Sequence, residues 1–341
     1  MSYRVGLIGA GGAGSRRAAA VAECPRSRLV KVCDLDLEAA ARAAAQSRAQ
    51  AVGAWEEVIE DPEVDIVILS ATHDQLSPIG AAAAAAGKHL LCEKPLGRNP
   101  SEVAGLVAAA AESGVCLAAG YNHRFHPAVA AVRGAADSGL LGELDFIRAR
   151  YGHGGRPGYD REWRGDRQKA GGGELLDQGA HLVDLCLWLL GGFESVTGFA
   201  ERRRWDIEPL EDNAFGLFRT GSGQVASIHA SWTQWKNLFS LEVFGSDGYA
   251  VAEGLGGSYG PETVRIGRRR PEGGKPSETR TVFEAADGSW SREWTGFLDR
   301  LEGKRTSGAD GSDALRTMQW IYRLYRAASE GRPVSASESV A

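Results

Sequence analysis

The sequence predicts an α/β protein with two domains, the first on a parallel sheet and the second, an α+β domain, on a largely antiparallel open sheet. Up to about Gly120, short apolar runs alternate with helical stretches. After that point, segments of alternating apolar and polar residues are joined by short turns. A length of 341 residues also suits two domains of roughly 100–200 residues each. We therefore expect a first domain over residues 1–121 and a second over residues 122–341.

The first domain is expected to alternate strands and helices. Strands cover residues 3–9, 28–34, 64–70, 89–95 and 115–122, and helices cover residues 14–24, 37–47, 77–87 and 99–114. This alternation is typical of βαβ units, whose strands run parallel. The last of these helices has clear start signals, because Asn99 precedes Pro100 and an acidic residue lies in the first turn.

The second domain shows a different pattern. Its expected helices cover residues 127–139, 171–190, 292–303 and 312–330, and its expected strands cover residues 143–155, 195–204, 212–220, 223–233, 237–245, 249–254, 263–270 and 279–285. The turns "TGSG" and "GSDG" between neighbouring segments are hairpin signals, so the sheet should be largely antiparallel. The Gly- and Pro-rich stretch around residues 256–278 is expected to be mobile.

Composition and charge exclude several function classes. The net charge of −5 leaves no basic surface for nucleic acid and no polybasic membrane patch. The five cysteines are odd in number and scattered, so they form neither a disulfide framework nor a zinc pattern. No apolar run approaches the ~20 residues that span a bilayer, and the first residues carry no signal-peptide core. We expect a reduced, cytoplasmic protein with no metal, nucleic-acid or membrane partner.

A glycine-rich loop follows the first expected strand and precedes a helix. It reads Gly9-x-Gly11-x-x-Gly14. The first glycine suits a tight turn, the second lets the backbone approach a pyrophosphate, and the third lets helix and strand pack closely. Asp34 ends the second strand, where a carboxylate can bind both ribose hydroxyls and repels a 2′-phosphate. These residues predict a Rossmann domain that prefers NAD to NADP; a glycine turn in an α/β domain of another function is the alternative.

Polar residues also end two later strands of the first domain. Glu93 and Lys94 end the strand at 89–95, and Ser70, Thr72 and His73 follow the strand before it. Ligands of open parallel sheets bind outside the carboxyl ends of strands, so these residues should flank the same crevice as the glycine loop. A lysine beside an oxidised nicotinamide would lose its proton more easily and could polarise a substrate hydroxyl. A solvated lysine before a turn is the alternative.

The apolar segment 171–190 carries three polar residues at spacings of four and three. Asp177, His181 and Asp184 therefore share one face of the predicted helix. Such a stripe is either a satisfied structural network or the wall of a site. His181 suits proton transfer near neutral pH, because an ordinary imidazole has a pKa of about 6.5. Asp177 would hold the imidazolium or bind the substrate hydroxyl, and Asp184 is expected to be structural. A metal site is the weaker interpretation, because no further ligand cluster is evident.

Five features follow one another along the chain: "GAGGAG", Asp34, "EKP", "GYNHRF" and "GGGELLDQGAHLVD". They occur in the same order in the Gfo/Idh/MocA family, the relatives of glucose–fructose oxidoreductase and inositol dehydrogenase, and the whole chain resembles that family. The resemblance implies a Rossmann domain and a second domain that binds substrate and forms oligomers. It also implies that Lys94, Asp177 and His181 form the catalytic set. The chain departs from many relatives, which have Thr-Pro-Asn where it has Thr72-His73-Asp74.

These observations define the expected contacts. The residues expected to contact NAD are Gly9, Gly11, Gly12, Ala13, Gly14, Asp34, Ser70, Thr72, His73, Glu93, Lys94 and Asn122. The residues expected to contact substrate are Tyr159, Trp163, Arg164, Trp232 and Trp235, since aromatic faces stack on sugars while polar groups read hydroxyls. The tryptophans are also common core residues. The acidic segment 206–212 is expected to be a solvated loop, or to favour a cationic substrate if it lines the site.

The predicted function is an NAD-dependent oxidoreductase. It oxidises a secondary hydroxyl of a sugar, amino sugar, cyclitol or sugar nucleotide to a ketone. A ketoreductase that uses the reduced cofactor, or a catalytically silent NAD-binding sensor, is the alternative. We expect a carbohydrate-like small molecule as partner and a homo-oligomer, a dimer or tetramer, formed through the outer face of the second sheet.

Overall fold

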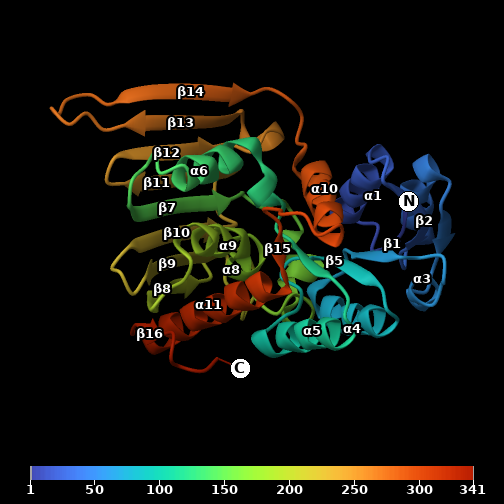
Figure 1. Ribbon diagram of the computed structural model, residues 1–341. Helices are drawn as coiled ribbons and strands as arrows, with labels where there is room; N and C mark the ends of the chain where they lie inside the picture. Colours follow the sequence, from blue (N-terminus) through green and yellow to red (C-terminus); the bar gives the residue numbers. More distant parts are fainter. Residues whose placement is uncertain (1, 341) are drawn as a thin grey trace. The chain divides into compact units, whose positions relative to one another are not determined.

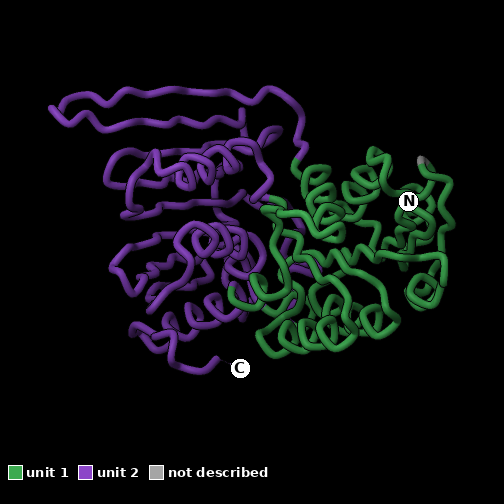
Figure 2. The backbone as a smooth tube through the Cα atoms, in the orientation of Figure 1, with its two compact units in different colours: residues 1–122, 168–171, 289–316 green, residues 123–167, 172–288, 317–341 purple. Residues whose placement is uncertain are grey.

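The computed structural model describes residues 2–340 and divides into two compact units (Figure 2). Unit 1 comprises residues 1–122, 168–171 and 289–316, and unit 2 comprises residues 123–167, 172–288 and 317–341. The first unit therefore includes two segments from far downstream in the sequence. Among residues 2–340, no helix combines the length and the apolarity that a membrane crossing needs.

Unit 1 is built on a seven-stranded sheet with the order β15-β6-β5-β4-β1-β2-β3 (Figure 1). Its strands are β1 (Tyr3–Ile8), β2 (Ser27–Cys33), β3 (Gln50–Val52), β4 (Ile66–Leu69), β5 (His89–Glu93), β6 (Leu117–Gly120) and β15 (Ala309–Asp310). Neighbouring strands run parallel except at the edge, where β15 pairs antiparallel with β6. The predicted parallel sheet is confirmed, and the order 3-2-1-4-5-6 is that of a Rossmann fold.

The helices of unit 1 largely match the predicted pattern. They are α1 (Gly12–Glu23), α2 (Leu37–Ala44), α3 (Glu56–Ile59), α4 (His73–Ala85), α5 (Pro100–Glu112) and α10 (Ser289–Leu301). The Asn99 side chain accepts a hydrogen bond from the Glu102 amide, which confirms the predicted start of α5. α4 begins earlier than predicted, so the Ser77-Pro78 pair lies inside it. β3 and α3 were not predicted, because elements of three or four residues are too short to show a periodic pattern.

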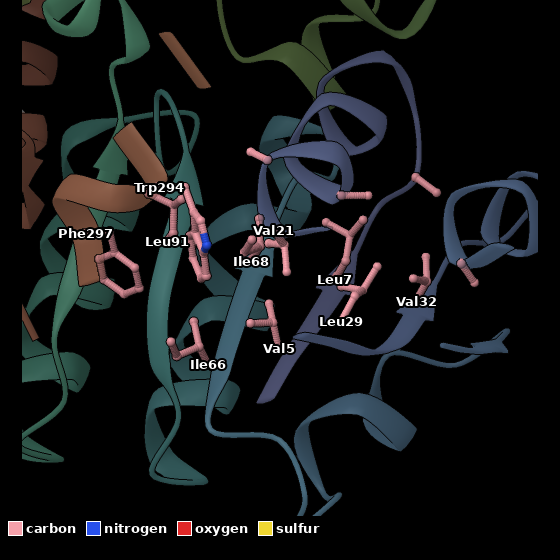
Figure 3. Packing of buried hydrophobic residues seen from close by; sticks show 14 of the residues in the cluster. Val5, Leu7, Val21, Leu29, Val32, Ile66, Ile68, Leu91, Trp294 and Phe297 are labelled. Atoms are coloured by element: carbon pink, nitrogen blue, oxygen red, sulfur yellow. The ribbon is translucent and has the colours of Figure 1, made fainter. Parts of the chain in front are cut away.

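α10 lies beside α1 and completes the core of unit 1 (Figures 1 and 3). Its Trp294 and Phe297 side chains are buried with Leu91 of β5 and Val21 of α1. The Trp294 indole N–H donates to the Ser27 hydroxyl at 2.9 Å, so this buried polar group is satisfied. Truncating a buried tryptophan costs about 3–5 kcal/mol, so α10 is an integral part of the fold of unit 1.

In the part of the chain that the structure describes, unit 2 is built on a nine-stranded sheet. Its strand order is β14-β13-β12-β11-β7-β10-β9-β8-β16. Its strands are β7 (Leu144–Gly152), β8 (Ser195–Glu201), β9 (Asn213–Arg219), β10 (Val225–Ser231), β11 (Leu238–Gly245), β12 (Gly248–Glu253), β13 (Glu262–Arg268), β14 (Ser277–Phe283) and β16 (Val334–Ser335). Its central pair, β7 and β10, runs parallel, and the other pairs run antiparallel. The predicted largely antiparallel sheet is confirmed.

Helices cover one face of this sheet. α6 (Pro127–Asp137) packs on β12 and β13, and α9 (Gly179–Leu190) packs on β7 and β10 (Figure 1). The remaining helices of the chain are α7 (Arg167–Ala170), α8 (Glu174–Asp177) and α11 (Gly311–Glu330), with short 3-10 turns η1 (Ala45–Ser47), η2 (Asn122–Phe125), η3 (Tyr159–Arg161), η4 (Trp163–Gly165) and η5 (Gly257–Tyr259).

The single helix predicted over 171–190 is two helices, α8 and α9, separated at Gln178. The helix starts later than predicted because the glycines before it pack closely. A Cβ at Gly172 would crowd the Tyr325 hydroxyl, and one at Gly173 would collide with the Glu211 carbonyl oxygen. The buried Glu211 carboxylate accepts hydrogen bonds from the Gly173 and Leu175 amides at 3.1 and 2.9 Å. This carboxylate fixes where α8 begins.

Candidate active site

The glycine loop of unit 1 has the geometry that its spacing predicts. Gly9 has a φ of +92°, which favours glycine, and a Cβ there would collide with the Ser70 carbonyl oxygen. A Cβ at Gly14 would collide with the Gly9 carbonyl oxygen, so α1 packs directly on the loop. At Gly11 and Gly12, in contrast, a Cβ would meet no atom within 4 Å. The outer two glycines of the motif serve the fold, and the middle of the loop is left open.

This open loop fits a dinucleotide pyrophosphate. Gly11 caps α1 and carries no side chain to satisfy the amides of the first turn, which includes Gly12 and Ala13. Unsatisfied amides and the positive end of the helix dipole favour a phosphate at that position. An open backbone and free helix amides are the two properties that a dinucleotide-binding loop needs.

Asp34 follows directly after β2 and lies beside the same loop. One carboxylate oxygen accepts a hydrogen bond from the Ala10 amide at 2.6 Å, and the other accepts one from the Asp36 amide at 2.9 Å. Each carboxylate oxygen can accept a further hydrogen bond, so both retain capacity for ribose hydroxyls. The half-buried Asp34 therefore fixes the glycine loop and can also face a ligand.

The residues after β4 lie in different surroundings. Ser70 and Thr72 are half-buried, and the Thr72 hydroxyl donates to Asp74 at 2.6 Å. His73 is the first residue of α4; it is buried, and its Nδ1 lies 2.8 Å from the Ala170 carbonyl oxygen. His73 thus ties α4 to the short segment at 168–171, and its contact with a cofactor stays a prediction.

The Glu93 side chain is held by a buried arginine. Arg17 of α1 donates to Glu93 at 2.7 Å and to Glu293 of α10 at 2.5 Å, and its guanidinium lies 4.5 Å from the centre of the Trp290 ring. Burial alone would lower the pKa of Arg17, but the two carboxylates raise it, so the arginine stays charged. Glu93 therefore anchors the end of β5, and half-buried Lys94 is the residue that follows.

Asn122 is the last of the residues that we predict to contact the cofactor. Its side-chain amide donates to the Ser289 hydroxyl at 2.9 Å, and both residues are buried. This bond ties the end of the first segment of unit 1 to the start of α10. The predicted cofactor residues thus include an open loop, a carboxylate beside it, and three side chains, Glu93, Asn122 and His73, that contact α1, α10 and residue 170.

In unit 2, Asp177 ends α8 and is paired with Arg164 of η4. The Arg164 Nε donates to the Asp177 carboxylate at 2.7 Å, and Asp177 is buried. Burial would lower the pKa of Arg164, but Asp177 raises it above its usual value, so the guanidinium is always charged. Arg164 also lies 4.4 Å from the centre of the Trp163 ring. The pair keeps the Asp177 carboxylate oriented.

His181 and Asp184 lie on α9, where both are buried. The Asp184 carboxylate accepts two hydrogen bonds from Arg124, from Nε at 2.8 Å and from Nη2 at 2.5 Å. This bidentate, buried pair agrees with the structural interpretation of Asp184. His181 is stacked on His123, with ring centres 3.8 Å apart. Among the described residues, no group of three or more His, Cys, Asp or Glu side chains is arranged to hold a metal ion.

The aromatic residues predicted to contact substrate differ in exposure. Tyr159 and Trp232 are buried and pack edge to face, with ring centres 5.0 Å apart, as core residues do. Burial raises the pKa of Tyr159, so its hydroxyl stays protonated. Trp163 is half-buried beside Arg164, whereas Trp235 is 92% exposed and lies next to Arg204. Of this set, Trp163 is the aromatic residue that combines partial exposure with a neighbour bonded to Asp177.

The acidic segment 206–212 is only partly the solvated loop that we predicted. Asp206 and Glu208 are exposed and paired with Arg202. Glu211 and Asp212 are buried; Asp212 accepts hydrogen bonds from the amides of residues 203, 204 and 205. All four carboxylates already have partners within unit 2, so this segment gives no support for a cationic substrate.

Comparisons with known proteins identify the family. The GFO/IDH/MocA C-terminal domain matches residues 129–251, and the oxidoreductase family's NAD-binding Rossmann fold matches residues 3–121. The chain belongs to the Gfo/Idh/MocA family. It therefore carries an NAD-binding Rossmann domain and a family C-terminal domain, and NAD is its cofactor.

Three curated relatives and one solved structure of this family are similar to the chain. A 1,5-anhydro-D-fructose reductase from Ensifer adhaerens is 29% identical over 334 residues, 96% of this chain and 97% of the relative. A levoglucosan dehydrogenase from Pseudarthrobacter phenanthrenivorans is 31% identical over 67% of this chain and 62% of its own length. A trans-1,2-dihydrobenzene-1,2-diol dehydrogenase from Bos taurus is 33% identical over 68% of each chain. The structure of GenD2 from gentamicin A biosynthesis, in complex with NAD, has a TM-score of 0.84 at 26% identity and covers 99% of this chain and 97% of its own.

Sequence reasoning missed the partners of several site residues in this Gfo/Idh/MocA protein. Arg17 reads as one of two solvated arginines on a helix, and nothing local shows that it meets Glu293. Arg164 was assigned to substrate, yet it also binds Asp177. Arg124 lies in the motif "GYNHRF", but its pairing with Asp184 spans 60 residues of sequence. No signal within either segment could have found these pairs.

Proposed function

We propose that the protein is an NAD-dependent dehydrogenase that oxidises a secondary hydroxyl on a ring, in a sugar, amino sugar, cyclitol or sugar nucleotide, to a ketone. The observation that carries the proposal is the α8–α9 wall, where the Asp177 carboxylate is oriented by Arg164 and buried His181 follows one turn later. The relatives support the substrate class, because their names describe rings that bear hydroxyl or keto groups.

The reaction breaks one O–H and one C–H bond and forms a C=O bond. NAD, when bound, would supply the acceptor for the hydride of the carbinol carbon. His181 takes the hydroxyl proton as general base, and Lys94 donates a hydrogen bond to the reacting oxygen. Asp177, oriented by Arg164, accepts a hydrogen bond from the substrate hydroxyl or from the imidazolium. Lys94, Asp177 and His181 are the proposed catalytic set.

The proposed substrate contacts fall into two groups. Arg164 binds Asp177, Trp163 lies beside Arg164, and both are partly exposed, so we assign them direct contact with the substrate. Tyr159 and Trp232 are buried and pack on each other, so we assign them a supporting role. Trp235, which is exposed, could contact an extended substrate at its outer end. We assign the cofactor contacts to the open glycine loop, Asp34 and the residues that end β4 and β5.

The test is a turnover screen followed by one substitution. Levoglucosan, an amino sugar and a nucleotide sugar are offered with NAD, and a simple aliphatic alcohol is the negative control. His181→Ala should lower kcat by about 10²–10⁴-fold and leave NADH affinity unchanged. His229→Ala is the matched control, because His229 lies on β10, stacked on Phe215. Preferred turnover of the aliphatic alcohol, or full activity of His181→Ala, would contradict the proposal.

Ketone reduction with NADH is the second candidate. It is favoured by the relative that covers 96% of this chain, which is a reductase. Initial rates with 1,5-anhydro-D-fructose and NADH, compared with levoglucosan and NAD at the same pH, decide the preferred direction. A silent NAD-binding sensor would bind NADH and turn over neither compound.

We also propose that the protein is a cytoplasmic homo-oligomer. Phe199 and Phe215 face each other on β8 and β9 and are exposed, as is Leu217. This apolar surface supports face-to-face association of two sheets. All five cysteines are free thiols in the structure, which supports a reducing compartment. Phe215→Lys should shift the oligomer toward monomer in sedimentation experiments; an unchanged mass would contradict this interface.

A further inference from the structure

A second histidine lies against the proposed base. The His123 ring is stacked on the His181 ring, with centres 3.8 Å apart and planes inclined by 28°. Both rings are buried. We propose that His123 is a positioning residue whose ring fixes the orientation of His181. The proposal deepens the proposed function and rests on His181 as the base.

His123 is itself held in place by aromatic neighbours. Its ring packs edge to face against Tyr151 at 4.9 Å, against Phe239 at 5.6 Å and against His126 at 5.5 Å between ring centres. Tyr151 also meets His181 edge to face at 6.0 Å. Such edge-to-face contacts are favourable and fix ring planes. The His123 ring, which stacks on His181, is therefore held by contacts with Tyr151 of β7 and Phe239 of β11.

The backbone next to His123 is attached to the helix that carries His181. Arg124 follows His123 in η2, and it forms the bidentate pair with Asp184, one turn after His181 on α9. On the other side, the Glu262 carboxylate accepts from the Ala128 amide at 2.7 Å and contacts His126 Nδ1 at 3.1 Å. The first attachment sets the position of η2 against α9, and the second joins the following residues to β13. The buried Asp184 thus has a purpose in the site, because its partner places His123.

Stacking matters because the two nitrogens of an imidazole are not equivalent. A flip of the His181 ring about its Cβ–Cγ bond places Cδ2 and Cε1 where Nδ1 and Nε2 were, and the rotation passes through an orientation perpendicular to the stacked one. Ring atoms at about 3.5–4.0 Å are already in van der Waals contact, so the rotating edge would enter the His123 ring. His123 therefore keeps the same nitrogen of His181 directed to the substrate. A flat ring is sufficient for this role, whatever its nitrogens do.

The experiment compares His123→Phe, which keeps a ring, with His123→Ala, which removes it. The probes are levoglucosan with NAD and 1,5-anhydro-D-fructose with NADH. We expect His123→Ala to lower kcat on the order of 10- to 100-fold, with KM and NADH affinity unchanged, since misplacing a reacting group acts on the chemical step. His123→Phe should restore kcat to within about threefold of the parent. A phenylalanine variant as impaired as the alanine variant, or a fully active alanine variant, overturns the proposal.

A double-mutant cycle tests whether His123 acts through His181. In a His181→Ala background, His123→Ala should cause no further loss of kcat. An additive further loss would show that His123 acts on the substrate or the fold directly, and would overturn the positioning role. Where His123→Ala fails to fold, His123→Leu replaces it, because leucine fills the volume without a flat face.

A readout independent of turnover separates this proposal from the proposed function. In protein labelled with ¹⁵N-histidine, the ring signals of His181 are assigned with His181→Ala. We expect one set of His181 ring signals in the parent and in His123→Phe, and doubled or averaged signals in the alanine or leucine variant. Unchanged signals in the latter overturn the proposal. If His181→Ala keeps full activity, the proposed base is wrong, while the spectra still decide whether His123 fixes the ring.

Discussion

The glycine-loop edge of unit 1 and the α8–α9 wall of unit 2 are built in opposite ways. At the edge, the features that we propose to face the ligand are backbone amides and the space above Gly11 and Gly12. At the wall, they are buried side chains held by charged partners, such as Asp177 by Arg164 and Asp184 by Arg124. A loop that binds a phosphate must leave room, whereas a wall that moves a proton must hold its groups still.

Because of this difference, the two regions should respond differently to substitutions. The glycine-loop edge should tolerate substitutions that keep the loop open, and it should lose stability where a new side chain collides with the backbone. The wall should fail where a buried charge loses its partner, because an uncompensated ion in a dry interior is costly.

Breaking the Arg124–Asp184 pair should have the largest effect. Asp184→Asn leaves the Arg124 charge buried without its carboxylate, so we expect a loss of about 3–5 kcal/mol in the free energy of unfolding. Chemical denaturation measures it. Asp206→Asn is the control; it breaks an exposed pair with Arg202 and should cost at most about 0.5 kcal/mol. Equal losses in the two variants would show that burial does not set the strength of these pairs.

Adding one methyl group to the glycine loop should separate folding from binding. Gly14→Ala places a Cβ against the Gly9 carbonyl oxygen, so we expect a loss on the order of 3 kcal/mol in stability. Gly11→Ala meets no atom, so its melting temperature should match the parent's, but the methyl group occupies the space for a pyrophosphate. NADH fluorescence titration should show weaker binding by Gly11→Ala. Parent-like NADH binding in that variant would place the pyrophosphate elsewhere.

Asp34 should affect cofactor binding more than folding. Asp34→Ala removes the acceptor for the Ala10 amide and the proposed ribose contact, so NADH affinity should fall about tenfold or more. Asp36→Ala is the matched control, because Asp36 caps α2 on the exposed side. The same titration with NADPH tests selectivity. Tighter binding of NADPH than of NADH by the parent protein would contradict the assigned role of Asp34.

A pH effect at an exposed ion pair should be the smallest. Arg332 and the Ser335 amide lower the pKa of Glu338 from 4.5 to about 2. Because the folded pKa lies below the unfolded one, this contribution to stability is present above pH 4.5 and is lost as the pH falls toward 2. The melting-temperature difference between the parent and Glu338→Gln should therefore shrink from pH 7 to pH 4. A melting-temperature difference that grows on acidification would contradict this assignment of Glu338. Glu272→Gln, at an exposed position, is the control.

The sequence by itself determined the parallel sheet, the glycine loop and the largely antiparallel second sheet. Each depends on local information: alternation of strands and helices, the φ that Gly9 needs, and period-two patterns with hairpin turns. The start of α5 was also predictable, because its cap lies within four residues. The family resemblance came from motif order, which is likewise a property of the linear chain.

The tertiary structure alone decided which polar residues are partners. Arg17 meets Glu293 across 276 positions, α10 completes the core of a sheet that begins at Tyr3, and Glu211 sets the start of α8. His123 stacks on His181, and Arg124, the next residue, forms hydrogen bonds with Asp184. A charge or ring is stabilised by what surrounds it within a few ångströms, and folding brings those atoms together from segments whose own sequences carry no mark of the pairing.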